Sequence, residues 1–130
     1  MVQTHMTKHD LPDMCLLAAN ENINYSGHAL DQMFERDITT DDVENVLRSD
    51  TNQLIETQSP SAAIGRSHSD ERFLIYDPKY TMDIIVVGVL QFVPLPEIYI
   101  VTVERVRDEV WDRIDGADPC LVRKMTSNVV

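Results

Sequence analysis

Residues 23–47 constrain the fold more than any other stretch, because they predict two consecutive helices together with their ends. Thr39 is a typical N-cap, and Asp42 follows at the position of the acidic partner in a capping box. A helix is therefore expected to begin within about two residues of Thr40. Its apolar stripe, which should pack against a strand at residues 84–89, consists of Val43, Val46 and Leu47.

A helix is also predicted just before this one, beginning after Ser26, which can cap its free N–H groups. His28 lies on its polar side, and Arg36 lies at the margin of that side. Only Asp37 and Ile38 separate the two helices, so they are expected to pack as a helix hairpin. The apolar residues that share the other side at helical spacing are Ala29, Leu30, Met33 and Phe34.

The remaining apolar patterns predict a β-sheet. Residues 72–76 and 97–104 are rich in β-branched and apolar residues, and 82–90 is so apolar that it should be covered on both faces. Together with a short helix around Met14, they predict an α+β fold in which N-terminal helices pack on a roughly four-stranded antiparallel sheet. Weaker strand signals lie at residues 54–55 and 62–66.

The C-terminal part is expected to close the fold with an amphipathic helix that stops near Gly116. Residues 118–130 are expected to form a loosely held tail. A chain of 130 residues is expected to fold as one domain, residues 1–130. The apolar residues that suggest the closing helix are Val106, Val110, Trp111 and Ile114.

The net charge of −11 at pH 7 is the most conspicuous property of the composition. Such a charge repels phosphate backbones, which argues against a general nucleic-acid binder. Three explanations stay open: a solvated surface that keeps the protein soluble, a host with a high salt concentration, or a surface complementary to a basic partner protein. The carboxylates that crowd two predicted helices, and are the candidates for partner binding, are Asp41, Asp42, Glu44, Asp108, Glu109, Asp112 and Asp115.

Several classes of protein are not expected. No apolar run reaches the length of about 18 residues that a membrane-spanning helix needs. The first 13 residues contain no apolar segment of the signal-peptide type, so a cytoplasmic location is expected. No metal-ligand spacing or glycine-rich phosphate loop is present, and neither a metal nor a cofactor is predicted. Cys15 and Cys120 are expected to be inert, partly buried thiols, and a disulfide between them stays open as the alternative.

His28 is the best single candidate for chemistry, because imidazole can transfer protons near neutral pH. Arg36 follows two helical turns later and could bind an anionic group beside it. The alternative interpretation, that His28 only packs or caps on the polar face, stays open.

The motif residues also resemble a known family. Ser26 to Ala29, Met33 to Arg36 and Ile38-Thr39 are similar to the opening motif of the domain of unknown function family 4258. The resemblance covers roughly residues 22–104. The family is thought to resemble RelE-like and barnase-like toxin ribonucleases, in which helices precede an antiparallel sheet. By this resemblance, the functional positions are His28, Arg36 and Thr102.

Two functions compete. The resemblance alone implies a metal-independent ribonuclease of a toxin–antitoxin system that uses His28 and Arg36. The charge and the altered motif favour a non-enzymatic acidic inhibitor, of immunity, antitoxin-like or phage anti-defence type, that engages a basic protein on a degenerate RelE-like fold. Self-association as a homodimer is a further possibility. The altered positions are Gln32 in place of an arginine, Asp83 or Ile84 in place of a strand histidine, and Glu104 in place of a tyrosine.

Overall fold

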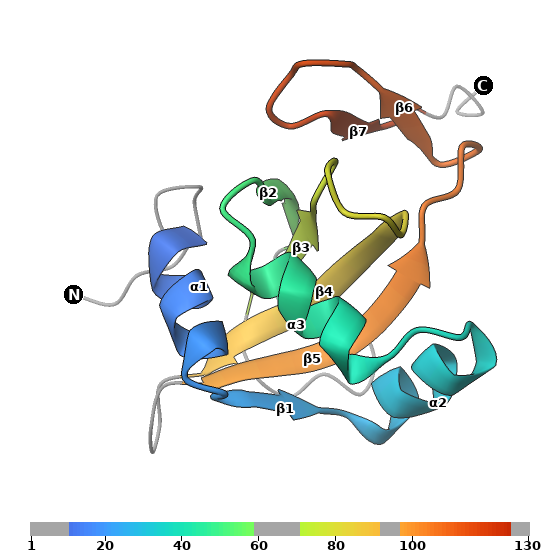
Figure 1. Ribbon diagram of the computed structural model, residues 1–130. Coiled ribbons are helices and arrows are strands. Elements are labelled where there is room, and N and C mark those ends of the chain that lie inside the picture. Colours follow the sequence, from blue (N-terminus) through green and yellow to red (C-terminus); the bar gives the residue numbers. More distant parts are fainter. Residues whose placement is uncertain (1–10, 59–70, 92–96, 126–130) are drawn as a thin grey trace.

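The computed structural model describes residues 11–58, 71–91 and 97–125. Within these residues the fold is α+β, as predicted, and helices and turns connect its strands (Figure 1). The elements are α1 (Leu11–Ala19), β1 (Ile23–Tyr25), α2 (Gly27–Glu35), α3 (Thr40–Arg48), β2 (Gln53–Gln58), β3 (Arg72–Tyr76), β4 (Ile84–Gln91), β5 (Glu97–Arg105), β6 (Trp111–Arg113) and β7 (Leu121–Arg123).

The main sheet has five strands in the order β1-β5-β4-β3-β2. Its β2, β3, β4 and β5 pair antiparallel, whereas β1 pairs parallel with β5. The sheet is therefore mixed and one strand larger than predicted, because the three residues of β1 are too few to show a period. The predicted strand at 62–66 lies outside the described residues.

Both faces of the sheet are covered, as the apolar run of β4 predicts. Alternate residues of a strand point to opposite faces, so β3 and β4 contribute to two separate cores. The core under the helices includes Phe73, Ile75, Ile84 and Val86 together with Val43, Val46 and Leu47. The core on the other face includes Leu74, Tyr76, Ile85 and Val87 together with Trp111, Cys120 and Leu121.

The predicted start of α3 is confirmed. Thr39 Oγ1 accepts a hydrogen bond from the backbone N–H of Asp42 at 3.1 Å, and Asp42 Oδ2 accepts one from the N–H of Thr39 at 2.9 Å. At the other end, Asn52 Nδ2 donates to the carbonyls of Val46 and Leu47 at 2.9 and 3.1 Å. Both helix ends therefore have partners for backbone groups that the helix itself leaves unpaired.

The predicted burial of α2 is only half right. The backbone N–H of Ser26 donates to the carbonyl of Ile100 at 2.9 Å, and its hydroxyl donates to that of Val101 at 3.0 Å. These bonds fix the rotation of α2 beside β5, so Ala29 and Met33 are buried. Leu30 and Phe34, predicted on the same apolar side, are instead 46% and 88% exposed.

The predicted helix hairpin is also different in the structure. A short connection, in which Asp37 has a left-handed φ of 57°, joins α2 to α3. However, α2 packs mainly against β5, whereas α3 packs against α1, β3 and β4. In Figure 1, α3 crosses the sheet next to α1, and α2 lies at the far end of β5.

The predicted C-terminal helix is wrong. After β5 the chain makes a turn and forms the antiparallel hairpin β6–β7, called the C-terminal hairpin below. Residues two apart share one face of a strand but not of a helix. In the extended chain, Trp111 therefore enters the core on the sheet face opposite the helices while Arg113 reaches Asp83. The loose tail is wrong for residues 118–125, since Cys120 and Leu121 are buried; residues 126–130 lie outside the described part.

Candidate functional site

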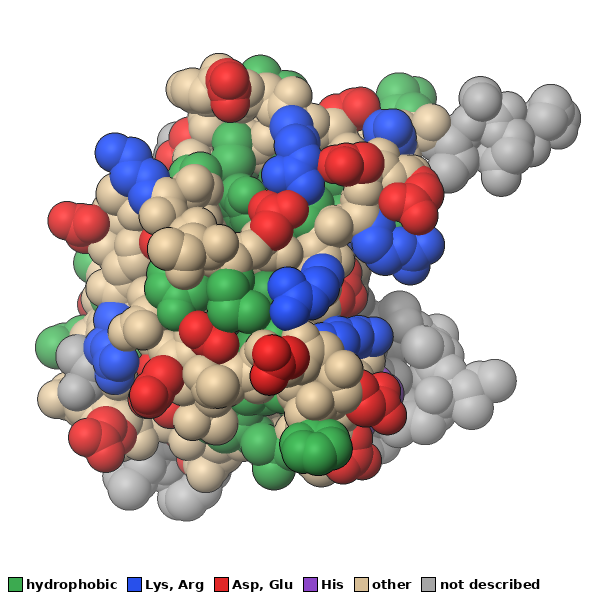
Figure 2. Space-filling view, turned by 45° about the vertical axis from the view of Figure 1, so that its right-hand side comes forward, with side chains coloured by type: hydrophobic (Ala, Val, Ile, Leu, Met, Phe, Trp, Pro, Cys, Tyr) green, Lys and Arg blue, Asp and Glu red, His purple; other side chains and the backbone are tan. Residues whose placement is uncertain are grey.

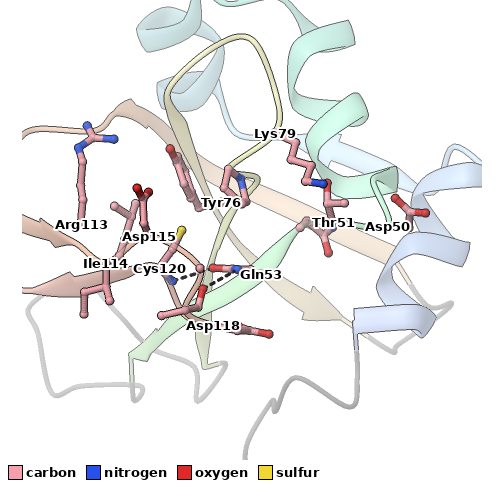
Figure 3. A pocket seen from close by; sticks show the side chains of 15 residues that line it. Asp50, Thr51, Gln53, Tyr76, Lys79, Arg113, Ile114, Asp115, Asp118 and Cys120 are labelled. Carbon is pink, nitrogen blue, oxygen red and sulfur yellow. Dashed lines mark hydrogen bonds between the residues drawn. The ribbon is translucent and has the colours of Figure 1, made fainter.

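A cavity of about 710 Å³, called the larger cavity below, lies between the loop of the C-terminal hairpin and the beginning of β2. Its wall carries charges of both signs, and polar side chains from several elements face it (Figure 3). Gln53 holds the hairpin loop to β2, because its amide donates to the carbonyl of Ala117 at 3.0 Å and accepts from the N–H of Cys120 at 2.8 Å. The charged lining residues are Asp50, Lys79, Arg113, Asp115 and Asp118.

Arg113 at the rim of this cavity also fastens the hairpin to the sheet. Its Nη2 lies 2.6 Å from Asp83 Oδ2, and its Nε lies 2.8 Å from Asp108 Oδ1. Tyr76 donates a hydrogen bond to Asp83 at 2.6 Å. Burial favours the neutral form of Asp83, but the hydrogen bonds from Arg113 and Tyr76 outweigh it and lower the pKa of this carboxyl group. The role of this cluster is therefore structural, and the mixed charges of the cavity favour no one class of ligand.

The second cavity, about 200 Å³, is called the basic cleft; it is lined by Arg36, Glu104, Arg105, Arg107, Val110 and Trp111. Arg36 Nη1 donates to the carbonyl of Val103 at 2.8 Å. Arg105 Nη2 donates to the carbonyl of Arg36 at 2.6 Å. Figure 2 shows basic side chains gathered between the C-terminal hairpin above and α2 below. The cleft thus concentrates positive charge in an acidic protein.

The structure does not bring the predicted pair His28 and Arg36 together. His28 is exposed in the first turn of α2 and does not line the basic cleft. Arg36 follows eight residues later, which corresponds to about 12 Å along a helix axis. Gln32 lies between them and accepts a hydrogen bond from the hydroxyl of Thr102 on β5. Of the positions implied by the resemblance, His28 and Arg36 therefore lie at opposite ends of α2, and Thr102 lies beside Gln32 on β5.

The seven predicted partner-binding carboxylates fall into two groups on different elements. On α3, Asp42 is used by the capping box and accepts a bond from Tyr80, Glu44 accepts one from Tyr25 at 3.0 Å, and Asp41 is exposed. In and before the C-terminal hairpin, most acids lie near a cation. The pairs are Asp108 with Arg113, Glu109 with Arg107 at 3.8 Å, and Asp112 with Lys124 at 3.9 Å, whereas Asp115 faces the larger cavity.

The sequence interpretation missed a surface that the structure shows on α2. Leu30 and Phe34 are exposed next to each other at helical spacing, and Figure 2 shows hydrophobic side chains bordered by acidic ones over this lower part of the molecule. The sequence contains a signal for this surface, because the apolar pairs Ala29-Leu30 and Met33-Phe34 lie four residues apart and are too wide a stripe to be buried completely. We call this surface the apolar–acidic face; it consists of Leu30, Asp31, Phe34, Glu35 and Asp37.

Two other kinds of site are absent from the part of the chain that the structure describes. No group of three or more histidine, cysteine, aspartate or glutamate side chains there could hold a metal ion. None of its helices is long and apolar enough to cross a membrane. Cys15 and Cys120 are both free thiols, and burial raises the pKa of each.

Comparison with known proteins gives one positive result. No curated protein and no solved structure matches the chain. The family model described as Domain of unknown function (DUF4258) matches residues 25–105, which is more than half of the 130 residues. The match runs from the end of β1 to the end of β5 and includes α2, α3 and both His28 and Arg36. The chain therefore belongs to the DUF4258 family.

Proposed function

We propose that this protein is a non-enzymatic, acidic binding protein that engages a basic partner protein through the apolar–acidic face. The observation that carries the proposal is the 88% exposure of Phe34 beside the half-exposed Leu30. The opposite side of α2 is fixed to β5, so the helix cannot rotate to bury these side chains. Exposed apolar groups with a polar rim mark interaction surfaces, and aromatic residues are enriched at their centres.

The charge around Phe34 indicates what kind of partner fits. Asp31, Glu35 and Asp37 are exposed and form no ion pair with the described part of the chain. Together with the net charge of −11, they would attract a basic surface and speed its association. Basic surfaces occur on proteins at the places where they bind nucleic acid. We therefore propose an inhibitor of the immunity, antitoxin-like or phage anti-defence type on a degenerate RelE-like fold.

Replacing Phe34 with serine is expected to raise the Kd for the purified partner about 30-fold or more, because a central aromatic anchor contributes about 2 kcal/mol or more. The partner would be isolated with the full chain at low salt, shown to be basic, and measured by surface plasmon resonance. Met125→Ser is the matched control, since Met125 is 93% exposed at the end of the C-terminal hairpin. Equal Kd values for Phe34→Ser and the native chain would contradict the proposal.

Two further measurements sharpen this test. Salt raised from about 50 to 500 mM should slow association steeply, because the Debye length shortens several-fold. Asp31→Lys combined with Glu35→Lys should slow association more than it speeds dissociation. Binding that does not respond to salt would exclude the charge complementarity. Sedimentation showing a dimer that Phe34→Ser dissociates would assign the face to a second copy of the chain instead.

The purified protein is expected to show no RNA cleavage above a buffer control. A ribonuclease needs proton-transfer groups within hydrogen-bonding reach of the reacting atoms, and His28 lies about 12 Å along α2 from Arg36. The assay would use a fluorescent RNA substrate with the native chain and His28→Ala. Cleavage by the native chain that disappears in His28→Ala, with an unchanged melting temperature, would replace the inhibitor proposal by the ribonuclease alternative.

A further inference from the structure

The basic cleft is a second site, separate from the apolar–acidic face and opposite to it in charge. We infer that it binds the phosphate group of a small phosphorylated compound. Three arginine side chains line the cleft against the single carboxylate of Glu104. This local excess of positive charge is unusual for a chain with twice as many acidic as basic residues, 22 against 11.

Two of the three arginines, Arg36 and Arg105, form no ion pair within the described residues. The hydrogen bonds of Arg36 and Arg105 go to backbone carbonyls, which hold the guanidinium groups in place without neutralising them. Arg107 lies 3.8 Å from Glu109, but both side chains are largely exposed, so this pair is weak. Asp42 interacts electrostatically with Arg105 from the side of α3. With Glu104, these acids reduce the positive charge of the cleft, although Glu104 is the only carboxylate among its lining residues.

The positions of the arginines are set by the fold. Arg36 is the C-cap of α2 and reaches the edge of β5 through the carbonyl of Val103. Arg105, at the end of β5, returns to the carbonyl of Arg36. Guanidinium groups that are already oriented lose little conformational freedom on binding, and their paired N–H groups match the oxygens of a phosphate.

The size and surroundings of the cleft indicate a small ligand. Its volume of about 200 Å³ equals that of about seven liquid water molecules. Val110 and the almost completely buried Trp111 complete its lining. The surrounding negative charge would repel every further phosphate of a polynucleotide. A compound with one phosphate group, such as a nucleoside monophosphate, therefore fits better than RNA.

Binding would be measured on the full chain by NMR titration with inorganic phosphate, against sodium chloride at equal ionic strength. The amide signals of Arg105 and Arg107 should shift and saturate with phosphate only. Arg105→Gln combined with Arg107→Gln should weaken binding about ten-fold or more, since hydrogen bonds between charged groups are lost. Arg48→Gln combined with Lys79→Gln removes the same charge away from the cleft and should leave the Kd unchanged.

Two results would contradict the binding of phosphate in the basic cleft. Equal shifts with chloride and phosphate, or equal weakening by the two double variants, would overturn it. Arg107→Gln alone provides a second variant whose side chain is too exposed to affect folding, and circular dichroism verifies the fold of all variants. Adenosine 5′-monophosphate should bind at least as tightly as inorganic phosphate. A ten-nucleotide RNA that binds more tightly than the monophosphate would overturn the assignment to a small ligand.

Discussion

Replacing Trp111 with alanine is expected to lower the free energy of unfolding by about 3–5 kcal/mol, as for other large buried aromatic residues. Trp111 is 2% exposed and packs on the sheet face opposite the helices. The guanidinium of Arg123 lies 4.6 Å from the centre of its ring, and this contact would be lost as well. A loss of this size is a large part of the roughly 5–15 kcal/mol that stabilises a typical domain.

The measurement is urea denaturation followed by far-UV circular dichroism, because Trp111 is the only tryptophan and its fluorescence disappears in the variant. Val122→Ala is the control within the same hairpin. Val122 is 41% exposed, so its free energy of unfolding should change by no more than about 0.5 kcal/mol. A loss below about 1 kcal/mol for Trp111→Ala would show that the C-terminal hairpin does not pack on the sheet.

A second large effect is expected at Gly88 in β4. A Cβ atom at this position would lie 2.8 Å from the carbonyl oxygen of Tyr99 and 2.9 Å from the ring of Phe73. Phe73 is buried and pairs directly with Gly88, so its ring has little room to move. Overpacking of this kind costs about 1–3 kcal/mol. It should exceed the gain of about 0.5–1 kcal/mol that alanine normally has over glycine within a strand.

Gly88→Ala should therefore lower the urea midpoint without changing the slope of the transition. Gly27→Ala is the matched control, because nothing lies within 4 Å of a Cβ atom at the start of α2. This control should be neutral or slightly stabilising. If Gly88→Ala is as stable as Gly27→Ala, the close pairing of β3, β4 and β5 around Phe73 is incorrect.

The parts of the fold that could be predicted from the sequence are those decided by nearby residues. Residues within a few positions of one another are enough to recognise the capping box of Thr39 and Asp42 and the apolar run of β4. The C-terminal hairpin depends instead on Arg113 reaching Asp83, thirty residues earlier, and helical spacing could not reveal that contact. The parallel strand β1 likewise depends on its pairing with distant β5.

The candidate sites show the same limit. The sequence predicted His28 and Arg36 on one helix; His28 lies in the first turn of α2 and Arg36 is its C-cap. Whether they share a site depends on the rotation of α2, which is fixed by bonds from Ser26 and Arg36 to carbonyls on β5. The same rotation exposes Phe34, so the apolar–acidic face could not be predicted from helical spacing alone. The net charge of −11 gives the excess of acidic residues but not where they lie on the surface.

The segment matched by the family model does not by itself complete the two cores of this protein. It spans residues 25–105, yet α1 covers one face of its sheet and the C-terminal hairpin covers the other. The boundary at residue 105 also divides the basic cleft. Arg36 and Arg105 lie inside the shared segment, whereas Arg107, Val110 and Trp111 follow it, so the segment alone supplies only part of the cleft lining.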